Sequence, residues 1–269
     1  MDGHWRERAL TFLAAANNHG DLAVKMSSLK QAKDILLSVE PSHAAELFPY
    51  LVELQSSPES VVRKALVEVI EEIGLTTMEH SSVLMPVLLT FLKDKENIVA
   101  RQSIISGTNI FCGVLEELSL QFHRRGIVER WLGELWAWMV RYKDAVFGIL
   151  LEAGTVGLKL LALKFLETYV LLFTSDTDDS KTPTAEAITR HGRAFNISVV
   201  VGGHPVLDPL ALTTEANRTL GILLDFLRSA STFPGSLTIS VVNWYHRSLE
   251  TCCGTIAACC CPALLCGVN

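Results

Sequence analysis

Among the segments whose residue types could do chemistry, the Gly202-Gly203-His204 run comes nearest to a phosphate-binding loop. Such a loop needs a Lys-Ser/Thr pair and a helix N-terminus directly after its glycines. Here Pro205 follows instead, so we interpret the run as a turn after a short strand at 197–201. The chain also lacks the H-E-x-x-H, G-x-S-x-G, Walker A and G-x-G-x-x-G patterns. These observations predict a protein that is not an enzyme and has no small-molecule substrate.

Two clusters of metal-ligating residue types stand in unsuitable patterns. Asp176, Asp178 and Asp179 could begin a calcium loop, but Lys181 occupies the sixth position, where an EF-hand needs glycine. Six of the seven cysteines lie in the last 18 residues, at spacings that do not match a paired C-x₂₋₄-C zinc site. This tail could also carry lipidated cysteines or come from a read-through or shifted exon. We expect no metal and no cofactor.

Composition and charge limit the kinds of partner. The 269 residues carry a net charge of −6, and 49% of them are hydrophobic. A nucleic-acid surface usually needs a basic stripe, so this charge argues against direct nucleic-acid binding. The N-terminus does not read as an export signal, and Cys112 alone lies outside the cysteine-rich tail, which is typical of an intracellular protein. The apolar segment at 156–173 contains Lys164 and Glu167, so we expect no membrane span.

The elements that must position any functional residue are amphipathic helices, and two neighbouring segments repeat one pattern. Residues 47–62 and 84–99 align without a gap at a spacing of 37 residues, with Pro49 on Pro86. Each copy contains an apolar helix, a polar turn and the start of a second helix. A period of this length built from two helices is typical of HEAT and armadillo solenoids. Because one pair cannot bury its apolar face alone, we predict an all-α solenoid of HEAT/ARM-type antiparallel helix pairs, with about five repeats.

Several local signals predict where helices begin, end and pack. Asp21 should cap a helix, and the internal prolines of the two copies should delay or kink theirs. Gly74 should end the second helix of the first copy, and a long helix should start at Asp94 or Asn97. The tryptophans between 131 and 138 predict core and inter-repeat packing, with an exposed partner hot spot as the alternative.

These signals divide the chain into three parts. We expect an N-terminal flank at 1–20, a repeat domain at 21–243, and a cysteine-rich tail at 244–269 outside the solenoid. Within the repeat domain, a long connection spans about 174–208 and begins with the acidic run SDTDDSKTP. Connections of this length are usually functional or disordered.

The chain resembles the N-terminal HEAT-repeat domain of the symplekin/Pta family over roughly residues 25–243. Four segments in the same order carry the resemblance: VVRKALVEVIEEI at 61–73, LKDKENIVARQSI at 92–104, LKLLALKFLETYV at 158–170 and GGHPVLDP at 202–209. The last segment and the long connection are most similar to plant members. After Asn243 the chain departs from the family pattern, which would continue with further apolar helices. The resemblance implies a nuclear, non-enzymatic scaffold of the pre-mRNA 3′-end cleavage and polyadenylation machinery.

The resemblance also implies a partner and a site. Family members bind a phosphatase of the RNA polymerase II C-terminal tail through these repeats, and they bind cleavage and polyadenylation factors. A lysine of the family's A-[IL]-K-F-[LV]-E helix lies at the phosphatase contact, and Lys164 in ALKFLE matches it. Glu167 and Lys159 are further candidate partner-binding residues, and the connection at about 174–208 is implicated too. The same fold would suit a cytoplasmic transport or vesicle-coat adaptor, which is the alternative function.

Overall fold

The chain folds into helices and connecting turns throughout the part that the structure describes. The structure is a computed structural model, and it describes residues 3–152, 154–174, 195–200 and 202–228. Two compact units divide the chain: Met1–Glu117 with Glu129–Leu151, and Leu118–Val128 with Glu152–Asn269. The long helix α7 (Asn97–Arg125) is continuous across this division.

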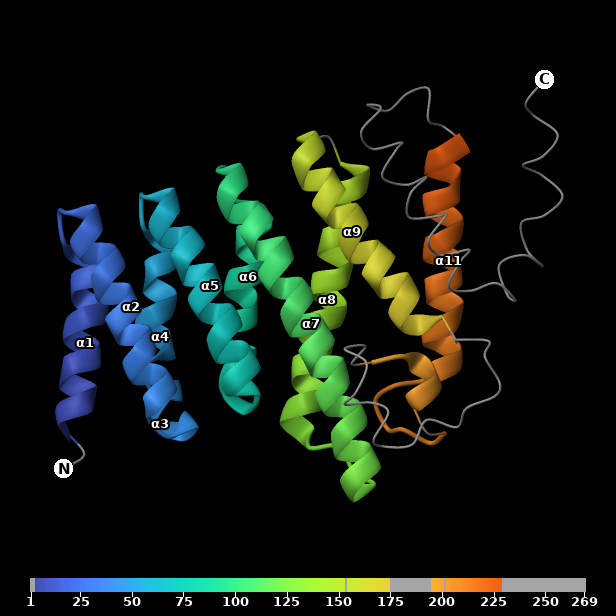
Figure 1. Cartoon of the computed structure of the whole chain (residues 1–269), viewed down its shortest axis with the longest axis horizontal. Coiled ribbons are helices and arrows are strands. Elements are labelled where there is room, and N and C mark those ends of the chain that lie inside the picture. Colours follow the sequence, from blue (N-terminus) through green and yellow to red (C-terminus); the bar gives the residue numbers. More distant parts are fainter. Residues whose placement is uncertain (1–2, 153, 175–194, 201, 229–269) are drawn as a thin grey trace, which may run out of the picture. The chain divides into compact units, whose positions relative to one another are not determined.

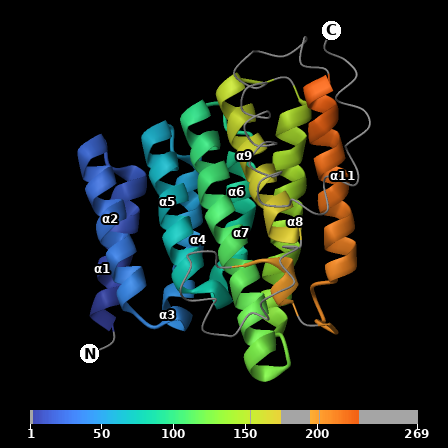
Figure 2. The ribbon, with the colours of Figure 1, turned by 45° about the vertical axis from the view of Figure 1, so that its right-hand side comes forward.

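The first unit stacks its helices side by side in chain order (Figure 1), as the view turned by 45° also shows (Figure 2). Besides α7, its elements are α1 (Gly3–Asn18), α2 (Leu22–Ser38), α3 (Pro41–Ala45), α4 (Phe48–Glu53), η1 (Leu54–Ser56), α5 (Ser60–Thr76), η2 (Met78–Leu84), α6 (Met85–Phe91) and α8 (Arg130–Leu151). The segment that we assigned to an N-terminal flank forms α1, which packs against α2, and α2 packs in turn against α5. The predicted all-α, HEAT/ARM-type solenoid is confirmed, while the number of repeats stays a prediction.

The second unit contains the last residues of α7, together with α9 (Val156–Phe173), η3 (Ile197–Val199) and α11 (Pro209–Arg228). α9 packs against α11, and the Tyr169 hydroxyl donates a hydrogen bond of 2.9 Å to Glu215 of α11. The short strand predicted at 197–201 is wrong. A 3₁₀ turn stands in its place, closed by a hydrogen bond of 3.0 Å from the Val199 amide to the Asn196 carbonyl and capped by the Asn196 side chain, which accepts a bond of 2.9 Å from the Ser198 amide.

The helix boundaries follow most of the local signals. The Asp21 carboxylate accepts a hydrogen bond of 2.8 Å from the Ala23 amide, so the predicted cap of α2 is confirmed. Pro49 and Pro86 lie in the first turns of α4 and α6, so both helices begin late rather than kink. The predicted stop at Gly74 is wrong, because α5 continues to Thr76. Gly74 instead gives room to α7, since an added Cβ would lie 3.3 Å from the Ile110 side chain.

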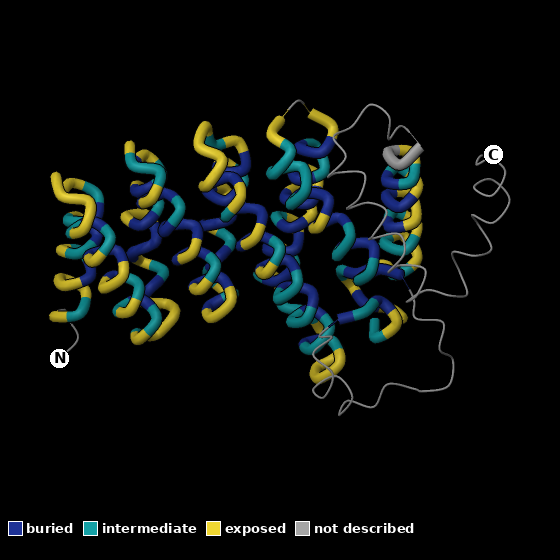
Figure 3. Tube along the Cα trace, turned by 45° about the horizontal axis from the view of Figure 1, so that its top comes forward, coloured by how far each residue is buried: buried dark blue, intermediate teal, exposed yellow. Residues whose placement is uncertain are grey.

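The core of the first unit extends along the whole stack, and one of its tightest contacts lies where α7 meets α8. An added Cβ at Gly107 of α7 would lie 2.3 Å from the ring of Tyr142 on α8, so only glycine admits this ring. The Tyr142 hydroxyl donates a hydrogen bond of 2.9 Å to the Ile104 carbonyl. Trp136 packs on Phe111 at a ring separation of 5.5 Å. Buried residues line the sides of the helices that face one another, and exposed residues line the opposite sides (Figure 3).

The three tryptophans of α8 therefore divide between core and surface. Trp136 is buried, as core packing predicts, whereas Trp131 and Trp138 are half-buried. The Trp131 indole donates a hydrogen bond of 2.5 Å to Glu129, and the Arg141 guanidinium lies 4.7 Å from the Trp138 ring centre. The core interpretation thus holds for Trp136 only.

Candidate partner-binding surface

Lys164 lies in the middle of α9 with its side chain exposed. Residues three, four and seven positions away share one helix face with it, and these include Leu160, Leu161 and Leu171 as well as Glu167 and Thr168. All three leucines are half-buried. The outer face of α9 therefore combines half-buried leucines with the exposed Lys164 and with the half-buried Glu167 and Thr168.

This arrangement suits a protein partner that presents a carboxylate within an apolar patch. The leucines can cover the aliphatic stem of the lysine and leave its ammonium group at the surface. When a partner excludes water from such a patch, the local dielectric constant falls and the ion pair strengthens. Energetic hot spots lie near the centre of an interface, where surrounding contacts exclude water.

The two other predicted residues lie on the same helix but in different surroundings. Glu167 follows Lys164 by one turn, is half-buried, and already has a partner within the chain. Lys159 precedes Lys164 by five residues, which at roughly 100° per residue places it on a different side of α9. The structure therefore brings Lys164 and Glu167 close together and separates Lys159 from them.

The described part of the chain resumes after the long connection at Phe195 and Asn196, and both residues contact the C-terminal end of α9. The Asn196 side-chain amide donates a hydrogen bond of 3.0 Å to the Thr174 carbonyl at the end of α9. Phe195 packs edge-on against Phe173 with a ring separation of 6.0 Å. The acidic run that opens this connection lies outside the described residues, so its predicted role in partner binding stays a prediction.

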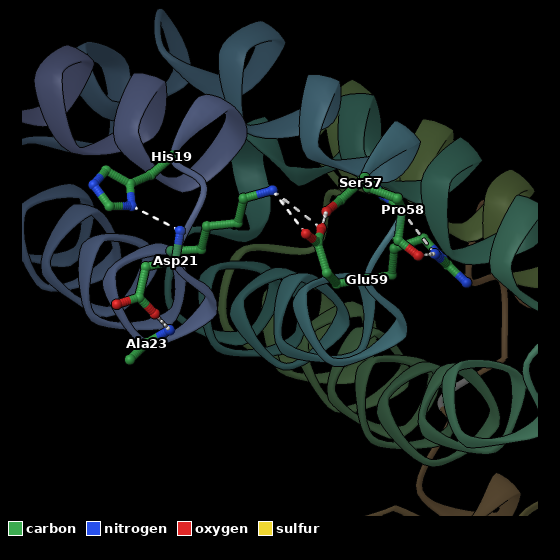
Figure 4. Close-up of polar contacts among 8 residues, drawn as sticks. His19, Asp21, Ala23, Ser57, Pro58 and Glu59 are labelled. Carbon is green, nitrogen blue, oxygen red and sulfur yellow. Dashed lines mark hydrogen bonds and ion pairs between the residues drawn. The ribbon is translucent and has the colours of Figure 1, made fainter.

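A polar network between repeats escaped the sequence-based predictions. The Lys25 ammonium of α2 donates two hydrogen bonds of 3.1 Å to the Glu59 carboxylate before α5. The Ser57 hydroxyl donates a third bond of 2.8 Å to the same carboxylate, as Figure 4 shows. The hydrogen bonds from Ser57 and Lys25 lower the pKa of Glu59. These bonds connect α2 to the turn that precedes α5. We call such a cluster of polar contacts between neighbouring repeats a rung.

Arg63 of α5 forms the next rung, and it is almost completely buried. Its Nε and Nη2 atoms donate bonds of 2.7 and 3.0 Å to the two Asp94 carboxylate oxygens. Its Nη1 atom donates bonds of 2.7 and 3.0 Å to the Ser57 and Pro58 carbonyls. Burial alone would raise the pKa of Asp94, but the bonds from Arg63 and from the Glu96 amide outweigh it, so the pKa is lowered.

A weak signal for this network exists in the sequence. Lys25 and Arg63 are 38 residues apart, close to the repeat spacing, and Ser57 aligns with Asp94 at a spacing of 37. In each rung the cation lies on one helix, α2 or α5. Its carboxylate acceptor lies in the turn between the two helices of the following repeat. Such bonds hold neighbouring repeats at a fixed distance and angle.

Within the described residues, no group of three or more His, Cys, Asp and Glu side chains could hold a metal ion; the cysteine-rich tail lies outside them. α7 is the one described helix with the length and apolar composition of a membrane span. Because 56% of that apolar window is buried inside the structure, its composition is also that expected of a core helix.

Stacked helix pairs, polar rungs between repeats and a mixed apolar and cationic surface define a HEAT/ARM-type scaffold. Residues 96–258 match the protein family described as Symplekin/PTA1 N-terminal. The match covers more than half of the chain, so the chain belongs to this family, and the resemblance seen in the sequence is confirmed. The match includes the first part of the segment that we assigned to the tail.

Family membership sets the general role of the chain. The family provides scaffolds for mRNA 3′-end processing in the nucleus, and its N-terminal domain is generally non-catalytic. A transport or vesicle-coat adaptor is not favoured by this membership.

Proposed function

We propose that this chain binds a phosphatase of the RNA polymerase II C-terminal tail as part of the pre-mRNA 3′-end cleavage and polyadenylation machinery, and that α9 forms the contact. One observation carries the proposal. Lys164 is exposed at the centre of half-buried leucines, in an ALKFLE helix that resembles the family's contact helix. A nuclear location and further contacts with cleavage and polyadenylation factors belong to the same proposal.

α9 has the rigidity that such a contact needs. The side of α9 opposite Lys164 is fixed in the core by Phe165, Leu166 and Tyr169, all of which are nearly inaccessible to solvent. A rigid helix pays little conformational entropy on binding, so more of the contact energy remains as affinity. The Glu167 and Lys159 side chains would contribute at the edge of the contact, where a charge changes the association rate more than the affinity.

The proposal is tested by isothermal titration of the full chain with a purified polymerase-tail phosphatase. Lys164→Glu should weaken binding by at least about tenfold, which corresponds to about 1.4 kcal/mol. Lys93→Glu is the matched control, because Lys93 is also an exposed lysine but lies in the turn between α6 and α7. It should bind as the wild type does.

Three results would count against the proposal. Wild-type affinity of the Lys164→Glu variant would remove α9 from the contact, and loss of binding on Trp138→Ala would move the site to α8. No measurable binding of the wild-type chain would reject the phosphatase as a partner.

A further inference from the structure

His204, in the loop at 202–208, is buried and makes three hydrogen bonds through its ring. The Nδ1 atom accepts bonds from the Val206 and Leu207 amides at 3.2 and 2.9 Å. The Nε2 atom lies 3.2 Å from the Leu118 carbonyl of α7. The ring also packs against Phe122 of α7 at a centroid separation of 4.7 Å. All these groups belong to the second unit.

These partners define the protonation state of the ring. An amide can only donate, so Nδ1 must carry a lone pair and accept from both amides. A carbonyl can only accept, so Nε2 must carry the proton and donate to Leu118. The geometry therefore requires the neutral imidazole in its Nε2–H form. A second proton could enter only at Nδ1, where it would confront two amide hydrogens.

The rest of the loop holds the His204 ring against α7. Gly203 adopts a φ of +87°, a left-handed conformation that favours glycine, and it turns the chain so that His204 reaches α7. Leu207 is fully buried beside the ring's acceptor bonds. Asp208 then caps α11 by accepting a bond of 3.0 Å from the Leu210 amide. The ring thus joins α7 to the start of α11.

The electrostatic surroundings do not favour a charged ring. Within the second unit, the titratable and charged side chains of the last turns of α7 are His123, Arg124 and Arg125, and those of the loop and the first two turns of α11 are Asp208 and Glu215. His123 and the two arginines are exposed, Asp208 accepts from the α11 amides, and Glu215 accepts from Tyr169. In the described part no carboxylate forms an ion pair with the ring. Burial lowers the pKa of His204, and the Leu118 carbonyl opposes this effect only in part.

We propose that His204 is a proton-sensitive clasp, which holds the 202–208 loop on the end of α7 while its ring is neutral and releases the loop when Nδ1 is protonated. Protonation removes both acceptor bonds and places a cation against Phe122 in a buried position. The loop carries the chain back from the long connection to α11, so its release would free the C-terminal end of that connection. The clasp is independent of phosphatase binding at α9.

Amide hydrogen exchange of the full chain, followed by NMR, tests the clasp. The Val206 and Leu207 amides should be protected at pH 7.5, and their protection factors should fall at least about tenfold by pH 5 after correction for the intrinsic rate. The His204→Asn variant keeps an acceptor oxygen near the Nδ1 position but cannot titrate. Its protection of the same amides should not depend on pH. His123→Asn, at an exposed histidine, should behave as the wild type.

A second measurement does not depend on how the chain behaves in acid. The imidazole nitrogen shifts of His204 at pH 7.5 should report the Nε2–H form. An Nδ1–H form at this pH would overturn the proposal. So would loop protection that responds to pH identically in the wild type and in His204→Asn, including a common loss through global unfolding.

Discussion

Replacing Arg63 with methionine tests whether the polar rungs stabilise the stack. The guanidinium makes four hydrogen bonds, and only 6% of the Arg63 side chain and 8% of the Asp94 side chain are exposed. Methionine fills a similar volume but leaves the Asp94 carboxylate buried without its cation. Breaking a buried ion pair from one side costs about 3–5 kcal/mol, mainly because the remaining charge is uncompensated. At about 2–4 °C per kcal/mol for a chain of this size, Tm should fall by about 6–20 °C.

The neighbouring residue supplies the control. Lys64 also pairs with a carboxylate, that of Glu68 one turn later, but this pair lies at the surface. Exposed pairs of this kind contribute about 0.3–0.5 kcal/mol, so Lys64→Met should leave Tm nearly unchanged. Circular dichroism at 222 nm would follow thermal denaturation to give the Tm of both variants, and urea denaturation to give their free energies of unfolding. Equal and small losses, below about 1 kcal/mol for both, would refute the reasoning.

The double variant Arg63→Met/Asp94→Asn separates the loss of the guanidinium hydrogen bonds from the cost of leaving the Asp94 charge uncompensated. Asparagine keeps the acceptor for the Glu96 amide, a bond of 2.8 Å in the wild type, and removes the stranded charge. The double variant should therefore be more stable than the sum of the single losses predicts, with a coupling of about 1–3 kcal/mol. Strict additivity would show that Arg63 and Asp94 do not act as a pair.

Three further predictions follow from other described contacts. Gly107→Ala should destabilise the chain by about 1–3 kcal/mol, because the added methyl group would clash with Tyr142. Gly221→Ala, in open space on α11, should be neutral or slightly stabilising. Thermal denaturation compares the two variants. Burial raises the pKa of Cys112 to about 11, so its alkylation at pH 8, read by peptide mass spectrometry, should be much slower than that of a free thiol. The lowered pKa of Asp94 means that its stabilisation is complete above the unfolded value of about 3.9 and is lost as pH falls through the folded value; acid titration of Asp94→Asn should lack this loss.

Periodicity was sufficient to predict the helices but not the contacts between them. The pattern of apolar residues predicted α2, α5, α7 and α9 because each must bury one stripe. It failed at Gly74, where glycine serves a close approach of α7 and not a helix end. It also failed at 197–201, where the Asn196 side chain caps a 3₁₀ turn that β-branched residues alone would not predict.

The candidate functional residues also divide into those that the sequence pointed to and those that it did not. Lys164 could be singled out because a family resemblance covers its helix, and its exposure agrees with that expectation. The Arg63–Asp94 pair and the His204 clasp join residues 31 and 86 positions apart. Spacing along one helix carries no information about such contacts, so they became visible only when the chain was folded.

We propose that α9 binds the polymerase-tail phosphatase, and a hydrogen-exchange footprint of the full chain with and without saturating phosphatase tests this proposal most directly. We predict slower exchange in peptides covering Val156–Phe173, with no change in peptides from α1. Unchanged exchange in α9 would contradict the proposal, whether new protection appears in α8 or in no segment.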